Sequence, residues 1–340
     1  MPEAFYPGPE DEGVSAAVLK AVSGIEFKTF SLGISSKNSE IKPLLREKIS
    51  GFISKTFNAV SANENFDLYL LVDPENLLVS AEITPVFIEG FYNKFSRSVA
   101  QTFHYCFKCK GRGCKNCSFT GKLSDESVQE LLEKILLPAF EAKESKFHGC
   151  GREDVDVLML GKGRPFVIEL AGPAKRSVKL AGLKAKINSS FKGKISVHSL
   201  KFCGKGKIAE IKNSVFSKIY SAGCFCGEKI SAEEIRALSG KRLEIIQRTP
   251  ERVEKRRAMK ERPKKAEILE SVFGGPGNFT LKILASHGLY IKEFISGDSE
   301  RTKPSISSLL RKKCACKELD VIEIIPQEKE KISGHNPETH

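Results

Sequence analysis

One segment of the chain combines clustered polar residues with glycines that can expose them. Residues 147–170 read FHGCGREDVDVLMLGKGRPFVIEL, in which Gly151, Arg152, Glu153 and Asp154 precede an alternating apolar run. A Gly-Lys-Gly turn and a second apolar run follow, a pattern that predicts two short strands joined as a hairpin. Asp154 would then lie where a loop meets a strand. A carboxylate in that position can be held rigidly and still be reached by a substrate.

Four cysteines have the spacing of a metal site. Cys106, Cys109, Cys114 and Cys117 form two CxxC pairs, separated by Lys-Gly-Arg-Gly. Four thiolates around one ion make the closed tetrahedral site of structural zinc. Because four protein ligands leave no open position, we expect zinc to hold structure here and to take no part in catalysis. A reduced, metal-free cluster and a redox role are the alternatives.

The other cysteines are less informative. The CFC triplet at 224–226 and the CAC triplet at 314–316 have a one-residue spacing that suits chelation of a single zinc poorly, so packed thiols are expected. Cys150 lies beside Asp154, but the only nearby histidine in the sequence is His148. We therefore do not expect a cysteine nucleophile.

Positive charge is concentrated in one part of the chain. The net charge is +13, and residues 175–265 carry 25 Lys and Arg against 8 Asp and Glu. Of the 55 basic and 42 acidic residues, 30 and 34 lie elsewhere. A concentrated basic segment predicts a polyanion partner, most often nucleic acid. A solvated basic surface without a partner is the alternative.

Hydrophobic periodicity predicts an α/β unit on the N-terminal side. Helical spacing covers residues 14–24 and 43–58, and apolar runs at 66–72 and 77–83 favour strands. The strand-like segment 85–101 would complete a compact unit that ends near residue 105.

A larger α+β domain is expected to follow. A helix beginning at Ser124 carries one apolar stripe and should be kinked or ended by Pro138. Residues 147–325 consist mainly of strand-like runs and basic loops, and the basic run 255–267 is expected to be a solvated loop or helix face. We therefore expect two domains with unstructured tails before and after them. The predicted domains are 13–123, which includes the cysteine cluster, and 124–326, and the predicted tails are 1–12 and 327–340.

The composition also limits the cellular context. No run approaches the roughly 18–20 apolar residues of a membrane span, and the N-terminal sequence lacks the apolar core of a signal peptide. We expect an intracellular protein with no membrane partner, cytoplasmic or, in a eukaryote, also nuclear. Its ten cysteines would be reduced or metal-bound.

Several longer motifs follow one another along the chain. After GREDVDV and GKGRPFVIEL come KIY at 218–220, QRTPERV at 247–253, YIKEF at 290–294 with RTKPS shortly after it, and ELDV at 318–321. Together they resemble the Pus-ten type of tRNA pseudouridine synthase, over about residues 85–325. The text PVFIEGFYNKFSRSVAQT resembles the end of that family's THUMP-containing RNA-binding domain.

The resemblance implies both a fold and a reaction. The implied α+β fold has an N-terminal THUMP-like α/β domain with a zinc knuckle. A pseudouridine-synthase catalytic domain with a mixed, mainly antiparallel sheet follows it. Members of this family isomerise uridine to pseudouridine in the TΨC arm of tRNA, at position 55 and in archaea often at 54. No cofactor takes part in the reaction. The partner is tRNA, and no protein partner is predicted.

The resemblance also assigns residues. The catalytic carboxylate matches Asp154, the active-site tyrosine Tyr220, and the basic partner of the carboxylate Lys292. Leu319, together with Ile291, would line the site and keep it dry. Arg152 would contact the substrate. Four further arginines would contact the phosphates of the RNA: Arg248, Arg252, Arg256 and Arg257.

The chemistry of these side chains suits the reaction. The glycosidic bond must break and re-form through carbon, and Asp154 can act as nucleophile or as a base at the ribose. Lys292 would favour its charged form and orient it. The uridine must leave its stack, and Tyr220 offers a flat face to receive it.

Two other functions fit parts of the sequence. A metal-dependent nuclease would use Asp156 and Glu169 on adjacent strands, although Glu169 lacks the lysine that follows such an acid by two residues in many nucleases. A non-catalytic tRNA-binding zinc protein would use the basic segment and the cysteines alone.

Overall fold

The computed structural model describes residues 9–256 and 258–326. Its N-terminal unit is a four-stranded sheet, in the order β2-β1-β3-β4, that packs with two helices. In chain order the elements are α1 (Pro9–Ala21), β1 (Thr29–Ile34), α2 (Ile41–Phe57), β2 (Val60–Ser61), β3 (Leu68–Asp73) and β4 (Leu78–Ile83). Leu68, Leu70 and Val72 alternate along β3 and are fully buried, as expected for a strand with one face on a core.

Ten further strands form one sheet in the order β10-β5-β9-β16-β11-β14-β13-β12-β15, with β8 paired to β9, and β6 and β7 pair separately. Within the ten-stranded sheet only β9 and β16 pair in parallel, so the sheet is mixed and mainly antiparallel, as predicted. Its strands are β5 (Val86–Lys94), β8 (Glu144–Gly149), β9 (Leu158–Ala171), β10 (Ile195–Cys203), β11 (Phe216–Cys226), β12 (Arg242–Arg248), β13 (Glu261–Phe273), β14 (Asn278–Ala285), β15 (Thr302–Lys303) and β16 (Cys314–Pro326).

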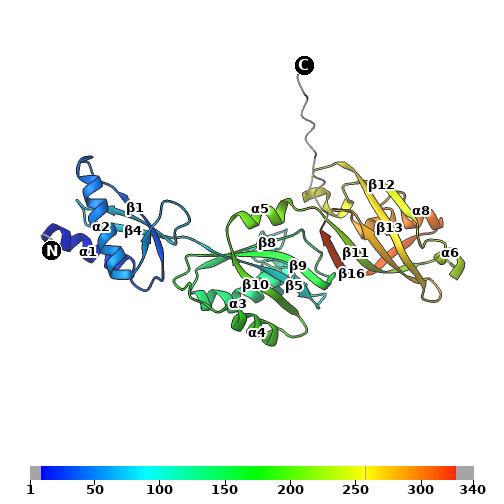
Figure 1. Cartoon of the computed structure of the whole chain (residues 1–340). Helices are drawn as coiled ribbons and strands as arrows, with labels where there is room; N and C mark the ends of the chain where they lie inside the picture. The colour runs from blue at the N-terminus through cyan, green and yellow to red at the C-terminus, as the bar shows by residue number, and fades with distance from the viewer. Residues whose placement is uncertain (1–8, 257, 327–340) are drawn as a thin grey trace, which may run out of the picture.

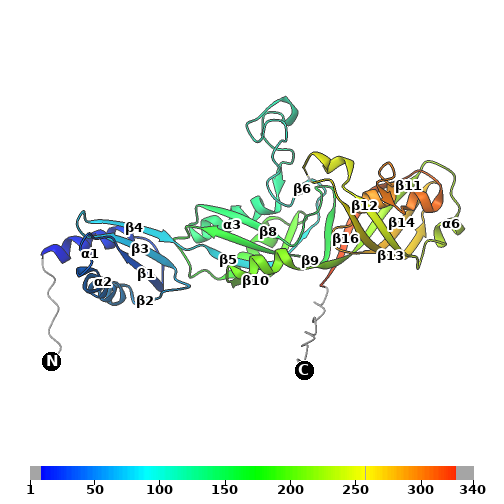
Figure 2. The ribbon, with the colours of Figure 1, turned by 90° about the horizontal axis from the view of Figure 1, so that it is seen from above.

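Helices cover this sheet and short elements connect it. They are α3 (Val128–Phe140), α4 (Leu180–Ser190), α5 (Gly206–Asn213), α6 (Ala232–Arg236), α7 (Ile291–Ser296), α8 (Ile306–Leu310) and the 3-10 helices η1 (Lys115–Cys117) and η2 (Glu251–Arg256). Figure 1 shows the N-terminal unit and the two halves of the large sheet in a row, with α3 and α4 on one face and α5 on the other. The cysteine-rich segment lies between β6 (Val99–Ala100) and β7 (Glu126–Ser127) and projects from the body (Figure 2).

The helix expected from Ser124 begins four residues later. Ser127 caps α3 through a hydrogen bond that its side chain accepts from the Glu130 amide, so the chain before it stays extended. The predicted apolar stripe is buried, and Pro138 lies in the last turn before the helix ends at Phe140.

Segment 85–101 lies elsewhere than predicted. We expected it in the N-terminal unit, but β5 pairs with β9 and β10 of the large sheet. Val86, Ile88 and Tyr92 belong to the core of that sheet, which explains the pairing. The start of α1 also differs, because Pro9 lies inside the segment expected to be an unstructured tail. Residues 1–8 and the other predicted tail, 327–340, lie outside the described residues.

The predicted hairpin is wrong, because β9 runs through the Gly-Lys-Gly sequence as one strand. Gly161 and Gly163 have positive φ angles of 58° and 74°, so they bend the strand without reversing it. A Cβ at Gly161 would lie 1.9 Å from the Ile322 carbonyl oxygen. Gly161 therefore permits a close approach to β16, and Gly163 permits one to Tyr92 of β5. The sequence pattern had predicted a turn at these two glycines. The basic run 255–267 differs as well, since its second half is strand β13.

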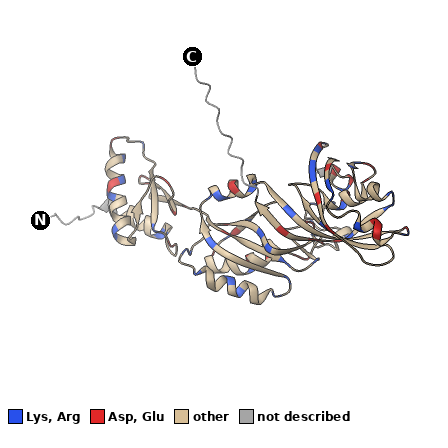
Figure 3. Ribbon diagram, turned by 45° about the vertical axis from the view of Figure 1, so that its right-hand side comes forward, with Lys and Arg blue, Asp and Glu red and all other residues tan. Residues whose placement is uncertain are grey.

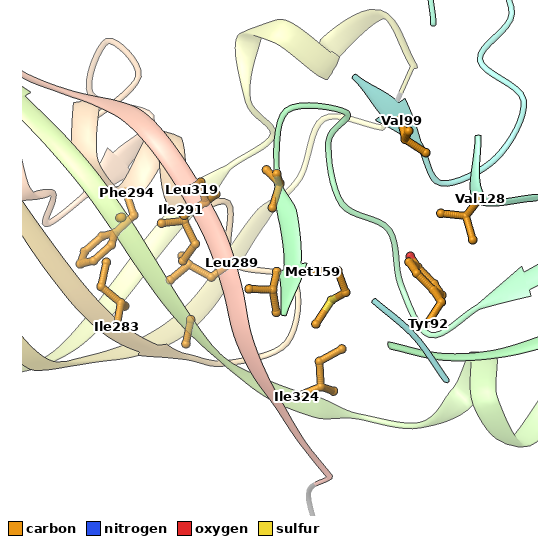
Figure 4. Close-up of a cluster of buried hydrophobic side chains, with 14 of the residues drawn as sticks. Tyr92, Val99, Val128, Met159, Ile283, Leu289, Ile291, Phe294, Leu319 and Ile324 are labelled. Carbon is orange, nitrogen blue, oxygen red and sulfur yellow. The ribbon is translucent and has the colours of Figure 1, made fainter. Parts of the chain in front are cut away.

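A continuous core joins the two halves of the sheet. Figure 4 shows Tyr92, Val99 and Val128 on one side of the β9–β16 contact and Leu289, Ile291 and Leu319 on the other. Over the described residues, no helix has the length and apolar character needed to cross a membrane.

Candidate active site and metal centre

The loop that carries Asp154 connects β8 to β9, and a buried ion pair between Arg164 and Glu153 holds it in place. Arg164 is 1% exposed, donates to the Cys150 carbonyl at 2.6 Å and pairs with Glu153 at 2.8 Å. Burial alone would lower the pKa of Arg164, but the charge of Glu153 raises it well above its usual value. Glu153 also accepts from the Tyr92 hydroxyl at 2.8 Å. Glu153, the residue next to Asp154, is thus buried and held by these contacts.

Two basic residues of the β5 region hold the rest of this loop. Lys94 is fully buried and its Nζ donates to the Val155 carbonyl at 2.6 Å. Arg97 donates to the Asp156 carbonyl at 2.8 Å and pairs with Asp320 of β16 at 2.8 Å. Because these contacts fix the backbone on the C-terminal side of Asp154, its position is set by its surroundings and not by the loop alone.

The Asp154 carboxylate itself faces two cations. Arg252 of η2 approaches its two oxygens at 3.2 and 3.0 Å, and Lys292 of α7 lies 3.6 Å from it. Arg252 is held in turn by Glu293, which is buried and accepts from its Nε at 2.5 Å. Burial would lower the pKa of Arg252, but Glu293 and Asp154 raise it well above its usual value. Asp154 remains 41% exposed, so a substrate can reach it.

Lys292 was predicted as the partner of Asp154, and the structure brings the two together. Its shorter contacts, however, are to Asp156, at 2.8 and 2.9 Å. Burial would raise the pKa of Asp156, but the bond from Lys292 lowers it below its usual value. Arg252, which we had expected to contact phosphates, makes the closer contact with Asp154.

Tyr220, Leu319 and Ile291 surround this group of charges. Tyr220 lies in β11 opposite Val321 of β16, and burial raises its pKa to about 12. The charge of Arg164 opposes this rise in pKa, and the charges of Glu153 and Asp154 contribute to it. Leu319 and Ile291 are buried beside each other (Figure 4). An apolar floor thus lies next to an exposed carboxylate.

Of the other predicted arginines, the structure describes the side chains of Arg152 and Arg248. Arg152 is exposed in the Asp154 loop, and Arg248 is exposed on β12, where it pairs with Glu261 at 2.5 Å. Arg257 and the side chain of Arg256 lie outside the described residues. Figure 3 marks the Lys and Arg positions on both halves of the large sheet.

The structure does not form the acid pair required for the nuclease alternative. Asp156 precedes β9 and binds Lys292, whereas Glu169 lies near the far end of β9 and contacts His148 at 3.1 Å and Lys146 at 3.5 Å. The two acids were expected on adjacent strands, but one long strand separates them. Of the residues that the structure describes, the group able to hold a metal ion is the four-cysteine cluster.

The sulfur atoms of that cluster form a compact tetrahedron. All four lie within 4.8 Å of one another, with separations of 3.8, 3.8 and 3.9 Å for the pairs Cys106–Cys114, Cys109–Cys117 and Cys114–Cys117. An ion with four bonds of about 2.3 Å to sulfur needs sulfur–sulfur edges of about 3.8 Å. The donor set therefore fits a metal ion.

Backbone amides support these sulfurs as thiolates. The Gly113 amide donates to Cys109 at 3.2 Å, and the Gly121 amide donates to Cys117 at 3.3 Å. The Cys109 amide lowers the pKa of Cys106 to about 6. Deprotonated sulfur is the form that binds metals.

Of the cysteines in the CFC and CAC triplets, Cys224, Cys226 and Cys314 are buried, as predicted, and Cys316 is half-buried. Cys224 lies opposite Cys316, and Cys226 lies opposite Cys314, across β11 and β16. Burial raises the pKa of Cys150, which does not favour a nucleophile.

The residues that support the Asp154 loop were not predicted from the sequence. Lys94, Arg97, Arg164 and Glu293 lie beneath or beside it, as described above. The sequence did contain a signal for these supports, because Lys94 and Arg164 are charged residues within segments that have a strand-like apolar pattern. Each occupies a position in its strand that faces the core. A charge at such a position needs a buried partner.

Comparison with known proteins identifies relatives over most of this architecture. The family model described as "Pus10, C-terminal" matches residues 87–325. The curated tRNA pseudouridine synthase Pus10 of Methanocaldococcus jannaschii is 42% identical over 76% of this chain and 57% of its own length. That of Methanosphaera stadtmanae is 39% identical over 85% and 75%, and that of Archaeoglobus fulgidus is 35% identical over 92% and 91%.

The chain thus spans little more than half of the first of these relatives and most of the other two. Among solved structures, a crystal structure of a Cbf5-Nop10-Gar1 complex aligns with 68% of this chain and 57% of that chain. Its identity is 13% and its TM-score 0.33, a level on which no conclusion rests. The match to the family model and the similarity to the curated relatives show that this chain belongs to the Pus10 family. The curated relatives described above are named tRNA pseudouridine synthases.

Proposed function

We propose that this protein isomerises uridine to pseudouridine in the TΨC loop of tRNA, at position 55 and, as a second target, at position 54. The observation that carries the proposal is Asp154, an exposed carboxylate on an anchored loop, paired with Arg252 at 3.0 Å and with Lys292 at 3.6 Å. Membership of the Pus10 family supplies the reaction class.

The reaction needs a carboxylate but no redox partner. The bond from ribose C1′ to N1 breaks, the ring turns, and a bond from C1′ to C5 forms. The proton lost from C5 is balanced by one gained at N1, so substrate and product are isomers. Asp154 serves as nucleophile or as ribose base, and Arg252 and Lys292 keep it ionised and oriented in either role.

The apolar residues beside Asp154 have a separate part in the proposal. The flipped uracil would stack against Tyr220, whose raised pKa keeps it a neutral phenol at the pH of the cell. Buried Leu319 and Ile291 would exclude water from the broken glycosidic bond. Arg152 and Arg248, both exposed, would contact the phosphates of the tRNA.

We also propose zinc as the metal of the cysteine cluster. Cys106, Cys109, Cys114 and Cys117 would hold it, and the closed set of four sulfurs gives it a structural role. The N-terminal α/β unit would add RNA contacts as a THUMP-like domain. A tRNA-modifying enzyme of this kind would work in the cytoplasm.

The test is to incubate the protein with unmodified tRNA transcript and to map pseudouridine. We expect product in the TΨC loop from the wild-type protein and none from Asp154→Ala. Cleaved RNA that requires magnesium would replace this proposal with a nuclease. Bound but unmodified RNA would replace it with a non-catalytic tRNA-binding protein.

A further inference from the structure

A lysine near the active site is buried without a partner. Lys218 of β11 is 8% exposed. Its ammonium makes no hydrogen bond or ion pair with any residue in the described ranges. Lys94, the other deeply buried lysine, donates to three backbone carbonyls. The Lys218 Nζ is not completely enclosed. An ammonium on a largely buried side chain without an acceptor is still poorly solvated, so Lys218 calls for an explanation that Lys94 does not.

Lys218 lies next to the loop that carries Asp154. It precedes Tyr220 by two residues in the same strand, so the two side chains point to the same face of the sheet. A Cβ built on Gly151 would lie 3.6 Å from the Lys218 Nζ and 3.3 Å from an Arg164 nitrogen. Gly151 has no side chain, so no Cβ fills the space between the loop and the Lys218 ammonium.

The charged groups around Lys218 do not neutralise the positive charge of its ammonium. Arg164 is neutralised by Glu153 at 2.8 Å, and Asp154 is occupied by Arg252 at 3.0 Å. Burial, together with the nearby charge of Arg164, lowers the pKa of Lys218 to about 8, although the charge of Glu153 acts in the opposite direction. Lys264 adds positive charge nearby, with its Nζ donating to the His287 carbonyl at 2.7 Å. Burial and the charges of Lys218 and Lys264 lower the pKa of His287, so its ring adds no counter-charge. An anion is the missing component.

We infer that Lys218 binds a backbone phosphate of the RNA, next to the nucleotide that is presented to Asp154. The inference rests on the proposed function, since it names the part of the substrate that this position takes. A phosphate suits the position because lysine acts as a compact point charge with three donors. Turning a nucleotide out of its stack rotates its phosphates against the protein, where a cation at the base of the loop can hold one of them.

The salt dependence of tRNA binding tests the inference. Binding is measured in an Asp154→Asn background, which stops turnover, with Lys218→Met, Lys218→Arg and Lys186→Met compared. Lys186 is an exposed lysine of α4, so its removal controls for the loss of one charge. Each phosphate contact contributes about 0.7 to 0.9 to the slope of log K against log salt concentration. For Lys218→Met, the slope of log K against log salt concentration should be smaller in magnitude by about 0.7 to 0.9. Lys218→Arg and Lys186→Met should have the same slope as the parent Asp154→Asn protein.

The same slope predicts that Lys218→Met binds tRNA roughly fivefold more weakly at about 0.15 M salt. Lys218→Met should also raise the melting temperature, because an unpaired buried charge is removed. If Lys218→Met is not recovered folded, Lys218→Gln is measured in the same way. An unchanged slope overturns the inference, whether the melting temperature rises or falls.

The outcome is separable from that of the proposed function. If wild-type protein forms no pseudouridine but Lys218→Met still reduces the slope, the phosphate site stands and the reaction does not. If wild-type protein forms pseudouridine and Lys218→Met leaves the slope unchanged, the reaction stands and the phosphate site does not.

Discussion

The cysteine cluster and the Asp154 site are built in opposite ways. The four thiols come from one stretch of twelve residues, and the amides that support them belong to the same stretch or follow it directly. The Asp154 carboxylate meets Arg252 from 98 residues further along the chain and lies 3.6 Å from Lys292, 138 residues further along. The first site depends on local turns, whereas the second depends on the whole sheet. Changes to the two sites should therefore have different consequences.

The largest effect is expected at Asp154. Asp154→Asn should reduce pseudouridine formation by on the order of 10³-fold or more, because the reacting carboxylate is lost. Its side chain is 41% exposed, so the melting temperature should change little. Single-turnover kinetics with tRNA transcript measure the effect, and Glu323→Gln, a substitution of a partly exposed acid of β16, is the control. Retained activity in Asp154→Asn would remove this residue from the mechanism.

A large effect on stability is expected beneath the loop. Arg164→Met leaves the Glu153 carboxylate buried without its partner, and breaking a buried pair costs about 3–5 kcal/mol. For a domain of this size the melting temperature should fall by roughly 10 °C. This fall in melting temperature is measured by thermal unfolding of Arg164→Met and of the double variant Arg164→Met/Glu153→Gln. The double variant should recover part of the loss, and equal values for the two would contradict a charge-based account.

Metal removal should have a local effect. A chelator, or Cys109→Ser, should release about one zinc per chain and unfold the cysteine-rich segment, because its contacts are mostly internal. The ten-stranded sheet should persist, as measured by far-UV circular dichroism and by the melting of the main transition. Metal analysis of purified protein gives the stoichiometry. Collapse of the entire fold would show that the cluster supports more than its own loop.

The smallest effect is expected from Tyr220→Phe. The ring is kept and the raised pKa of about 12 leaves the hydroxyl protonated in ordinary assays, so the rate should fall by no more than about tenfold. Tyr220→Ala should cost considerably more, because the stacking face is lost. The pKa is about 10 in the unfolded chain and about 12 in the fold, so Tyr220 contributes stability below pH 10 that is lost between pH 10 and 12. Tyr220→Phe should weaken that alkaline loss, as a pH series of melting curves would show.

Spacing and periodicity predicted the local features best. The CxxC pairs, the apolar stripe of α3 and the strands β3 and β4 depend on neighbours in sequence, and the structure contains them. Asp154 and Lys292 were identified by resemblance, which also implied that they would meet. The bonds of Arg252 to Asp154 and of Arg97 to Asp320 were not predicted, because each depends on how distant elements pack.

The errors have a shared physical cause. Two glycines in an apolar run favour a turn locally, but in β9 they allow a strand to bend and to approach β16. Segment 85–101 appeared to complete the first sheet, but its alternating apolar residues are buried in the second. In both cases a partner strand that is distant in sequence decided between two conformations that the local pattern allows.

The parallel ladder between β9 and β16 pairs two residues of each strand, Leu158 with Asp320 and Met159 with Val321. Asp154 enters from one side of this seam, and Arg252 and Lys292 enter from the other. A fragment that stops before β11 would carry the carboxylate without either cation, and one that starts there would carry the cations without it. If the proposed function is correct, the catalytic site therefore forms only when the two halves of the large sheet assemble, and neither half contains it alone.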